Sequence, residues 1–112
     1  MNKMENLIKE ILKFRDERNW EQFHNPKDLA ISLSIEASEL LENFQWRTNE
    51  EAASEKKDDI KDELADVMIY SLLLAHQLGI DPREAITQKI KKNEKKYPVE
   101  KAFNSKKKYT DL

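Results

Sequence analysis

Hydrophobic residues recur at helical spacing along most of the chain. In the first eighteen residues, Met4, Ile8, Ile11 and Leu12 lie three or four positions apart with Lys and Glu between them, which is typical of an amphipathic helix. The same period runs through 26–44 and 55–78, and residues that favour helix dominate 82–97. The pattern predicts an all-α chain whose four main helices pack as a four-helix-type bundle.

Capping residues indicate where these helices begin and end. The pairs Asn25-Pro26 and Asp81-Pro82 each join an N-cap side chain to a proline at the first helical position. Gly79 stands just after the third helix, where a residue in the left-handed region commonly ends a helix. Thr48 resembles an N-cap and predicts a short helical turn, whereas the polar stretch 49–58 is predicted to be a flexible loop.

The chain has 112 residues, which predicts one domain. We expect residues 1–98 to form the helical functional domain. The tail 99–112 has no helical stripe and is predicted to be extended. No apolar run is long enough to span a bilayer, and the charged N-terminus does not resemble a signal peptide. A cytoplasmic location without a membrane partner is therefore expected.

Charge and cysteine content exclude several classes of function. Twenty Lys and Arg nearly balance 22 Asp and Glu, so there is no general basic field that would indicate nucleic-acid binding. There is no cysteine, which excludes disulfides, zinc thiolates and thiol catalysis.

Two acidic pairs stand out because they lie in or beside apolar stripes. Glu36 takes a place in a helical row otherwise filled by Leu and Phe, and Glu39 follows one turn later. Glu63 and Asp66 are also three apart, at the start of an apolar run. They are predicted to lie beside a core stripe made of Ile60, Leu64, Val67, Ser71, Leu74 and Leu78. If the two helices pack antiparallel, the four acids face one another across a groove.

The acids of such a cluster repel one another unless they are protonated or neutralised by a cation. Two carboxylates about 5 Å apart repel by roughly 3 kcal/mol at an effective dielectric constant near 20. An all-oxygen donor set favours a hard cation, Mg²⁺ or Mn²⁺, which shares its remaining positions with water and substrate phosphates. A di-iron centre does not fit, because it needs Glu-x-x-His pairs and neither His24 nor His76 has that spacing. Taken alone, each acidic pair also fits a solvated helix edge.

Four short motifs follow one another along the chain. They are Glu36-Ala37-Ser38-Glu39, Phe44-Gln45-Trp46, Glu63-Leu64-Ala65-Asp66 and Lys89…Asn93…Tyr97-Pro98. In this combination the chain closely resembles the MazG-like all-α nucleotide pyrophosphohydrolases, in particular the branch that includes dCTP pyrophosphatase. Family members often carry a further acid directly beside the first Glu, and here that place is taken by Ile35 and Ala37.

The resemblance implies hydrolysis of a nucleoside triphosphate to the monophosphate and pyrophosphate, with nucleotide-pool house-cleaning as the role. A dCTP-like nucleotide is a candidate substrate, and a homo-oligomer, a dimer or a tetramer, is implied. The resemblance assigns Mg²⁺ binding and catalysis to Glu36, Glu39, Glu63 and Asp66. It places Trp20, Trp46, Tyr70, Lys89 and Asn93 at the substrate.

The residues themselves leave some alternatives open. Core packing is the ordinary role for a tryptophan in a small helical domain, and Lys89 lies on a lysine-rich helix. A catalytically silent oligomeric scaffold and a nucleotide-binding sensor without turnover are the competing functions. The scaffold does not explain acids in core stripes, whereas the sensor would use every residue that the enzyme uses.

Overall fold

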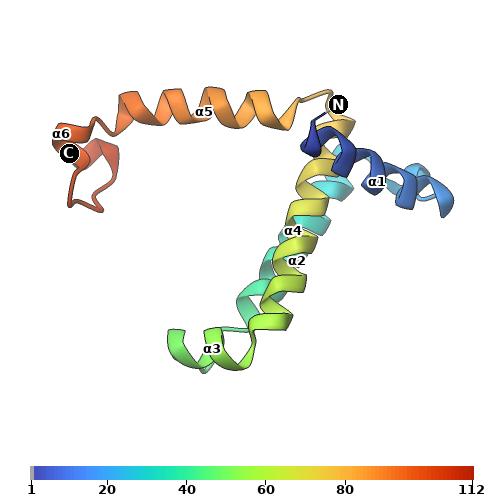
Figure 1. Cartoon of the computed structure of the whole chain (residues 1–112), viewed down its shortest axis with the longest axis horizontal. Coiled ribbons are helices and arrows are strands. Elements are labelled where there is room, and N and C mark those ends of the chain that lie inside the picture. The colour runs from blue at the N-terminus through green and yellow to red at the C-terminus, as the bar shows by residue number, and fades with distance from the viewer. Residues whose placement is uncertain (1) are drawn as a thin grey trace. The chain divides into compact units, whose positions relative to one another are not determined.

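The computed structural model describes residues 2–112, and every regular element in that range is helical (Figure 1). The all-α prediction is therefore confirmed. The described residues form six α-helices and two short 3₁₀ turns: α1 (Lys3–Glu17), α2 (Pro26–Glu42), α3 (Asn49–Glu55), α4 (Lys57–Gln77), α5 (Pro82–Lys96) and α6 (Val99–Ala102), with 3₁₀ turns at Glu21–Phe23 and Tyr109–Asp111.

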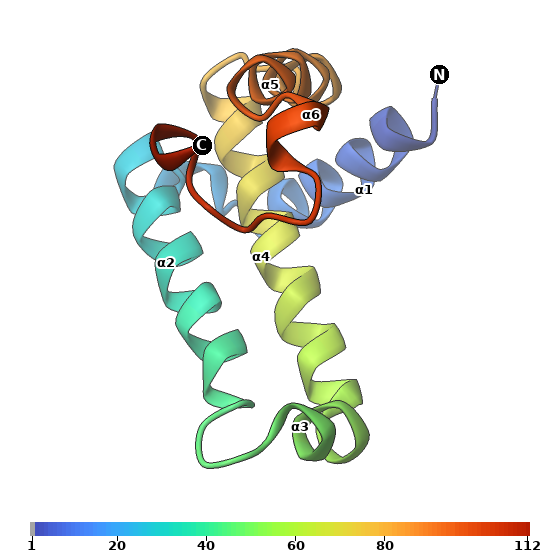
Figure 2. The same cartoon turned by 90° about the vertical axis from the view of Figure 1, so that its left-hand side faces the viewer.

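The chain forms two compact units, residues 1–80 and 81–112. In the first unit, α4 contacts each of α1, α2 and α3, and its packing against α2 is by far the most extensive. Figure 2 shows α2 and α4 side by side and antiparallel, with α3 at the end where they are connected. The antiparallel arrangement expected for the two acid-bearing helices is therefore present.

The predicted caps are made by the expected side chains. Asn25 Oδ1 accepts a hydrogen bond from the Asp28 amide at 2.8 Å, and Thr48 Oγ1 accepts one from the Glu51 amide at 3.1 Å. Asp81 caps α5, and Gly79 has φ 68° at the end of α4. These contacts satisfy amides that have no partner within their own helix.

The segment 49–58 was predicted to be a flexible loop, and that prediction is wrong. Seven of its residues form α3, and α4 begins almost immediately afterwards at Lys57. The reason is local: Thr48 caps the helix, Glu and Ala favour helix, and Ala52 is completely buried. The connection between α2 and α4 is therefore largely helical.

The core of the first unit is small. Among the described residues, the buried apolar side chains are Leu29 of α2, Ala52 of α3 and Leu73 of α4. Of the six residues predicted to form the core stripe of α4, three are half-buried and three are exposed: the first are Ile60, Val67 and Leu74, and the second are Leu64, Ser71 and Leu78. The packed face also includes Glu63, Asp66, Tyr70 and Leu73, which are buried or half-buried. The acids of α4 therefore lie within the packed face and not beside it.

The second unit consists of α5, α6 and the final 3₁₀ turn. The tail 99–112 was predicted to be extended, and it contains a helical turn at Val99–Ala102 and a 3₁₀ turn at Tyr109–Asp111. The rings of Tyr97 and Tyr109 pack edge to face with centroids 6.0 Å apart, and Lys96 Nζ lies 4.9 Å from the Tyr109 ring centroid. These aromatic contacts hold the tail against the end of α5.

Candidate metal centre and active site

Three glutamates from two helices converge in the first unit. Glu36 and Glu39 come from α2 and Glu63 comes from α4, and each offers a carboxylate oxygen within 4.8 Å of the other two. All three side chains are half-buried. The α2–α4 packing thus places a set of oxygen donors at the spacing that a single cation could bridge.

Two of these carboxylates have an oxygen without a partner. Oε2 of Glu36 and Oε2 of Glu63 are buried and accept no hydrogen bond. A buried carboxylate oxygen without a donor is costly. A hard cation would supply the missing partner, so the residues present fit a divalent metal ion such as Mg²⁺.

The cluster also changes the acidity of its members. Burial raises the pKa of Glu36 to about 7, with further contributions from the carboxyl groups of Glu39, Asp66 and Glu63. Burial likewise raises the pKa of Glu63, and the carboxyl groups of Glu39 and Asp66 add to the effect. The charge of Asp66 thus acts on both glutamates, although the set of oxygens within 4.8 Å of one another comprises Glu36, Glu39 and Glu63. No cation contributes to either shift.

These raised pKa values predict how the stability of the metal-free protein depends on pH. The folded state keeps a proton on Glu36 up to about pH 7, whereas the unfolded chain loses it near the ordinary pKa of about 4.3. The folded state therefore binds more protons between these values, and stability falls as pH rises through this range. We expect the melting temperature in EDTA to decrease from pH 5 to pH 7.5.

A matched variant isolates the cluster in this experiment. Glu36→Gln should flatten the decrease, whereas Asp62→Asn, an exposed acid on α4, should leave it unchanged. Burial lowers the pKa of His24, with a smaller contribution from Arg15, so this group works in the opposite direction over the same range. A wild-type melting temperature that stays constant or rises with pH in EDTA would contradict the assignment.

Tyr70 lies on α4, one turn after Asp66. Burial raises the pKa of its hydroxyl, and the charges of Glu36, Asp66 and Glu39 raise it further. The hydroxyl is therefore protonated at neutral pH and available as a hydrogen-bond donor. Of the nine predicted site residues, Glu36, Glu39 and Glu63 have oxygens within 4.8 Å of one another. Asp66 and Tyr70 are linked to them through charge, because the charge of Asp66 raises the pKa of Glu36 and of Tyr70.

The two tryptophans differ in their surroundings. Trp46, in the turn after α2, has φ 61° and a side chain that is 92% exposed. Left-handed backbone is unusual for a bulky residue and is often found at functional sites. Trp20 is 42% exposed and packs edge to face on Phe14, with ring centroids 5.8 Å apart. Trp46 therefore makes no contribution to the core, whereas Trp20 is partly structural.

Lys89 and Asn93 lie one turn apart on α5, in the unit formed by residues 81–112, and both are exposed. The spacing places them on one side of this helix. Among the described residues, none of α5 is buried, so Asn93 does not lie on a buried face within this unit.

A polar pocket of about 440 Å³ adjoins the acid cluster. It shares Glu39 and Glu63 with the cluster and is otherwise lined by Glu42, Asn43, Arg47, Lys56 and Asp59. Arg47 and Lys56 were not singled out in the sequence. Their positions on either side of α3 are the one feature that could have drawn attention to them, because the sequence pattern of this segment did not indicate a site.

A half-buried set of carboxylates between two helices, on a scaffold without cysteine, defines this chain as an all-α protein with a candidate divalent-metal centre. The family model described as the MazG-like family matches residues 31–112. The chain belongs to the MazG-like family.

Individual relatives agree with this membership. The chain is 38% identical over 104 residues to dCTP pyrophosphatase 1 of Bos taurus, covering 88% of this chain and 62% of the relative. The Homo sapiens protein of the same name is also 38% identical over 104 residues, with 61% of its length covered. The chain thus spans about three-fifths of the length of these curated relatives.

A crystal structure of a pyrophosphatase from Archaeoglobus fulgidus has the same fold. It superposes with a TM-score of 0.82 at 45% sequence identity, covering 88% of this chain and 94% of that one. Separately, no helix within residues 2–112 combines the length and apolar character needed to cross a membrane.

Proposed function

We propose that this chain is a Mg²⁺-dependent nucleoside triphosphate pyrophosphohydrolase that releases a nucleoside monophosphate and pyrophosphate. The observation that carries the proposal is the group of three glutamates whose oxygens lie within 4.8 Å of one another, two of them with an unpartnered buried oxygen. The names of the relatives, dCTP pyrophosphatase 1 and pyrophosphatase, support the same chemistry.

In this proposal, Glu36, Glu39, Glu63 and Asp66 hold the metal. Bound Mg²⁺ neutralises phosphate charge and lowers the pKa of a bound water. The reaction adds the oxygen of water to the α-phosphorus and breaks its bond to the oxygen that bridges to the β-phosphate, so pyrophosphate leaves. A carboxylate of the cluster accepts the proton of the attacking water. The protonated Tyr70 hydroxyl donates a hydrogen bond to the substrate.

The remaining predicted residues take roles in substrate binding. Trp46 offers an open aromatic face on which a base can stack, and Trp20 offers a partly exposed one. Lys89 and Asn93 supply a cation and an amide for the phosphate chain. We place the protein in the cytoplasm, where it would remove surplus or non-standard nucleotides, dCTP-like ones among them.

Pyrophosphate release from a panel of NTPs and dNTPs, with Mg²⁺, with Mn²⁺ and with EDTA, tests the proposal. We expect release that needs a divalent cation, together with one monophosphate per pyrophosphate. Binding of a nucleotide without turnover would instead identify a sensor. If the protein neither binds nor hydrolyses any nucleotide, the catalytically silent scaffold is the remaining function.

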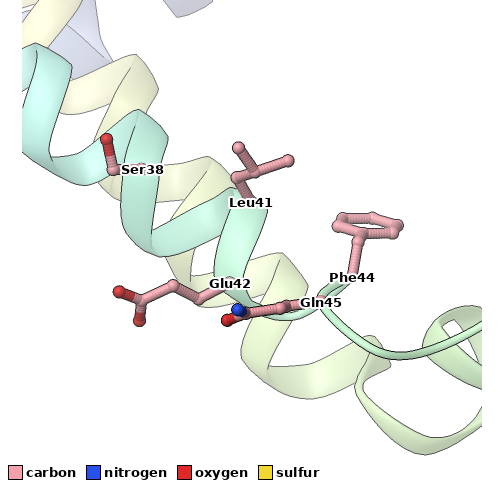
Figure 3. Close-up of a pocket in the computed structure, with 5 residues that line it drawn as sticks. All are labelled: Ser38, Leu41, Glu42, Phe44 and Gln45. Atoms are coloured by element: carbon pink, nitrogen blue, oxygen red, sulfur yellow. The ribbon is translucent and has the colours of Figure 1, made fainter.

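We also propose that the protein is an obligate oligomer, a dimer or a tetramer made of two dimers. Apolar side chains are exposed along the central pair of helices: Ile31, Ile35 and Leu41 on α2, Phe44 in the turn that follows it, and Leu64 and Met68 on α4. Figure 3 shows Leu41 on the last turn of α2 and Phe44 on the loop just after it, both lining a pocket of about 490 Å³. With so few buried apolar residues, a second copy is the simplest cover for these surfaces.

Leu41→Glu should weaken this association. The Leu41 side chain is 69% exposed, so the substitution costs little within one chain but places a charge in the proposed interface. Light scattering should show the wild type as an oligomer at micromolar concentration and the variant as smaller species. A stable, active wild-type monomer would contradict the proposal, and Glu42→Gln, on the polar side of the same pocket, is the control.

A further inference from the structure

Two cationic side chains, Arg47 and Lys56, line the polar pocket beside the acid cluster. Both make only weak contacts with other groups of the chain. Arg47 Nη1 donates to the backbone oxygens of Asn43 and Gln45, each at 3.4 Å, and its Nε lies 4.0 Å from Glu55 Oε2. Lys56 Nζ lies 3.7 Å from Asp59 Oδ2. All of these contacts are at the long limit of hydrogen bonds or ion pairs, so most donors of both side chains are unused.

Neither cation serves as a counter-ion for the cluster. The acids paired with Arg47 and Lys56 are Glu55 and Asp59, and these are not among the four convergent acids. Both cationic side chains are nevertheless half-buried, which costs side-chain entropy and hydration. Their placement is explained if they bind an anion that enters from outside the chain.

We propose that Arg47 and Lys56 bind the pyrophosphate part of the nucleotide, the β- and γ-phosphates, while the α-phosphate lies at the carboxylate cluster. This inference rests on the proposed function. Glu39 and Glu63 belong both to the cluster and to the pocket, so a phosphate chain that reacts at the first can extend into the second. The pocket is lined by charged and amide side chains alone, which suits phosphates and not a base.

The charge of the pocket makes this binding conditional. Its lining includes the acids Glu39, Glu42, Asp59 and Glu63 against two cations, so without a metal ion it repels a polyanion. A divalent cation at Glu39 and Glu63 removes that excess, and the guanidinium fork of Arg47 then matches phosphate geometry. Pyrophosphate should therefore bind in Mg²⁺ and not in EDTA.

Calorimetric titration of the full chain with inorganic pyrophosphate, and separately with dCMP, tests the assignment. In Mg²⁺, Arg47→Gln and Lys56→Gln should each weaken pyrophosphate binding by roughly 10- to 100-fold, the range for a lost charged hydrogen bond. Affinity for dCMP should stay at the wild-type value. Arg47→Lys keeps the charge but not the fork and should recover part of the loss.

Lys61→Gln is the matched control, because it removes an exposed lysine of α4 that is outside the pocket. The inference is overturned if Lys61→Gln weakens pyrophosphate as much as the pocket variants, if dCMP is weakened equally, or if the pocket variants bind pyrophosphate like the wild type. Melting curves show which variants are folded. If Arg47→Gln does not fold, Lys56→Gln and Arg47→Lys still decide the test. Turnover of the wild type is scored separately: its absence defeats the proposed function, whereas turnover with unchanged pyrophosphate affinities defeats this inference alone.

Discussion

Glu63→Gln is expected to lower pyrophosphate release by orders of magnitude while leaving the metal-free protein as stable as the wild type or more stable. Glu63 has a buried oxygen without a partner and a pKa raised by burial and by the carboxyl groups of Glu39 and Asp66. The amide keeps the size and relieves the repulsion. Catalysis should suffer because metal-assisted charge neutralisation and positioning supply most of the rate in this kind of chemistry.

Thermal melts of both proteins in EDTA and in Mg²⁺ provide the measurement. Mg²⁺ should raise the melting temperature of Glu63→Gln less than that of the wild type, since a ligand stabilises only as far as it binds. Asp62→Asn makes a comparable charge change at an exposed position on the same helix and should behave like the wild type. If Glu63 were instead half of a buried ion pair, its loss would destabilise the protein by a few kcal/mol and leave the Mg²⁺ response unchanged.

Trp46→Ala is expected to raise KM without unfolding the protein. Loss of a stacked base costs about 1–3 kcal/mol, which corresponds to roughly a 5- to 150-fold increase in KM. A core tryptophan would instead cost about 3–5 kcal/mol of stability, but the Trp46 side chain is 92% exposed. Its melting temperature should therefore stay close to that of the wild type.

Two comparisons make the Trp46 result specific. Trp20→Ala should lower the melting temperature, because Trp20 packs against Phe14 at 5.8 Å between ring centroids. Light scattering on Trp46→Ala distinguishes base stacking from a subunit contact. A variant with unchanged KM, or one that dissociates into smaller species, would remove Trp46 from the substrate site.

Local signals were sufficient for most of the fold. Asn25, Thr48 and Asp81 cap the helices that their sequence positions predict, because a cap depends on residues only two or three positions away. The stretch 49–58 was misjudged because its charge suggested a solvated loop, whereas burial of Ala52 against its neighbours gives α3 a packed side. That contact depends on tertiary structure.

The site was predictable in part. The three-residue spacing within each acidic pair was enough to place Glu36 near Glu39 and Glu63 near Asp66. The antiparallel packing of α2 and α4 then brings Glu63 close to Glu36 and Glu39. The face of α4 was not predictable, because apolar residues surround much of this helix and several stripes fit the pattern equally well. Leu64 is exposed and Leu73 is buried, and only the position of α2 decides between them.

Because the carboxylates of the cluster come from two separate helices, they meet only when α4 is correctly positioned along the length of α2. A slip of α4 along α2 by one helical turn, about 5.4 Å, is larger than the 4.8 Å that spans the three glutamate oxygens, so it would separate the pairs. The connection 43–56 contributes no member of this set. Insertions there that preserve the register should leave the four acids together, whereas a deletion that pulls α4 by a turn should disperse them in a protein that is still helical.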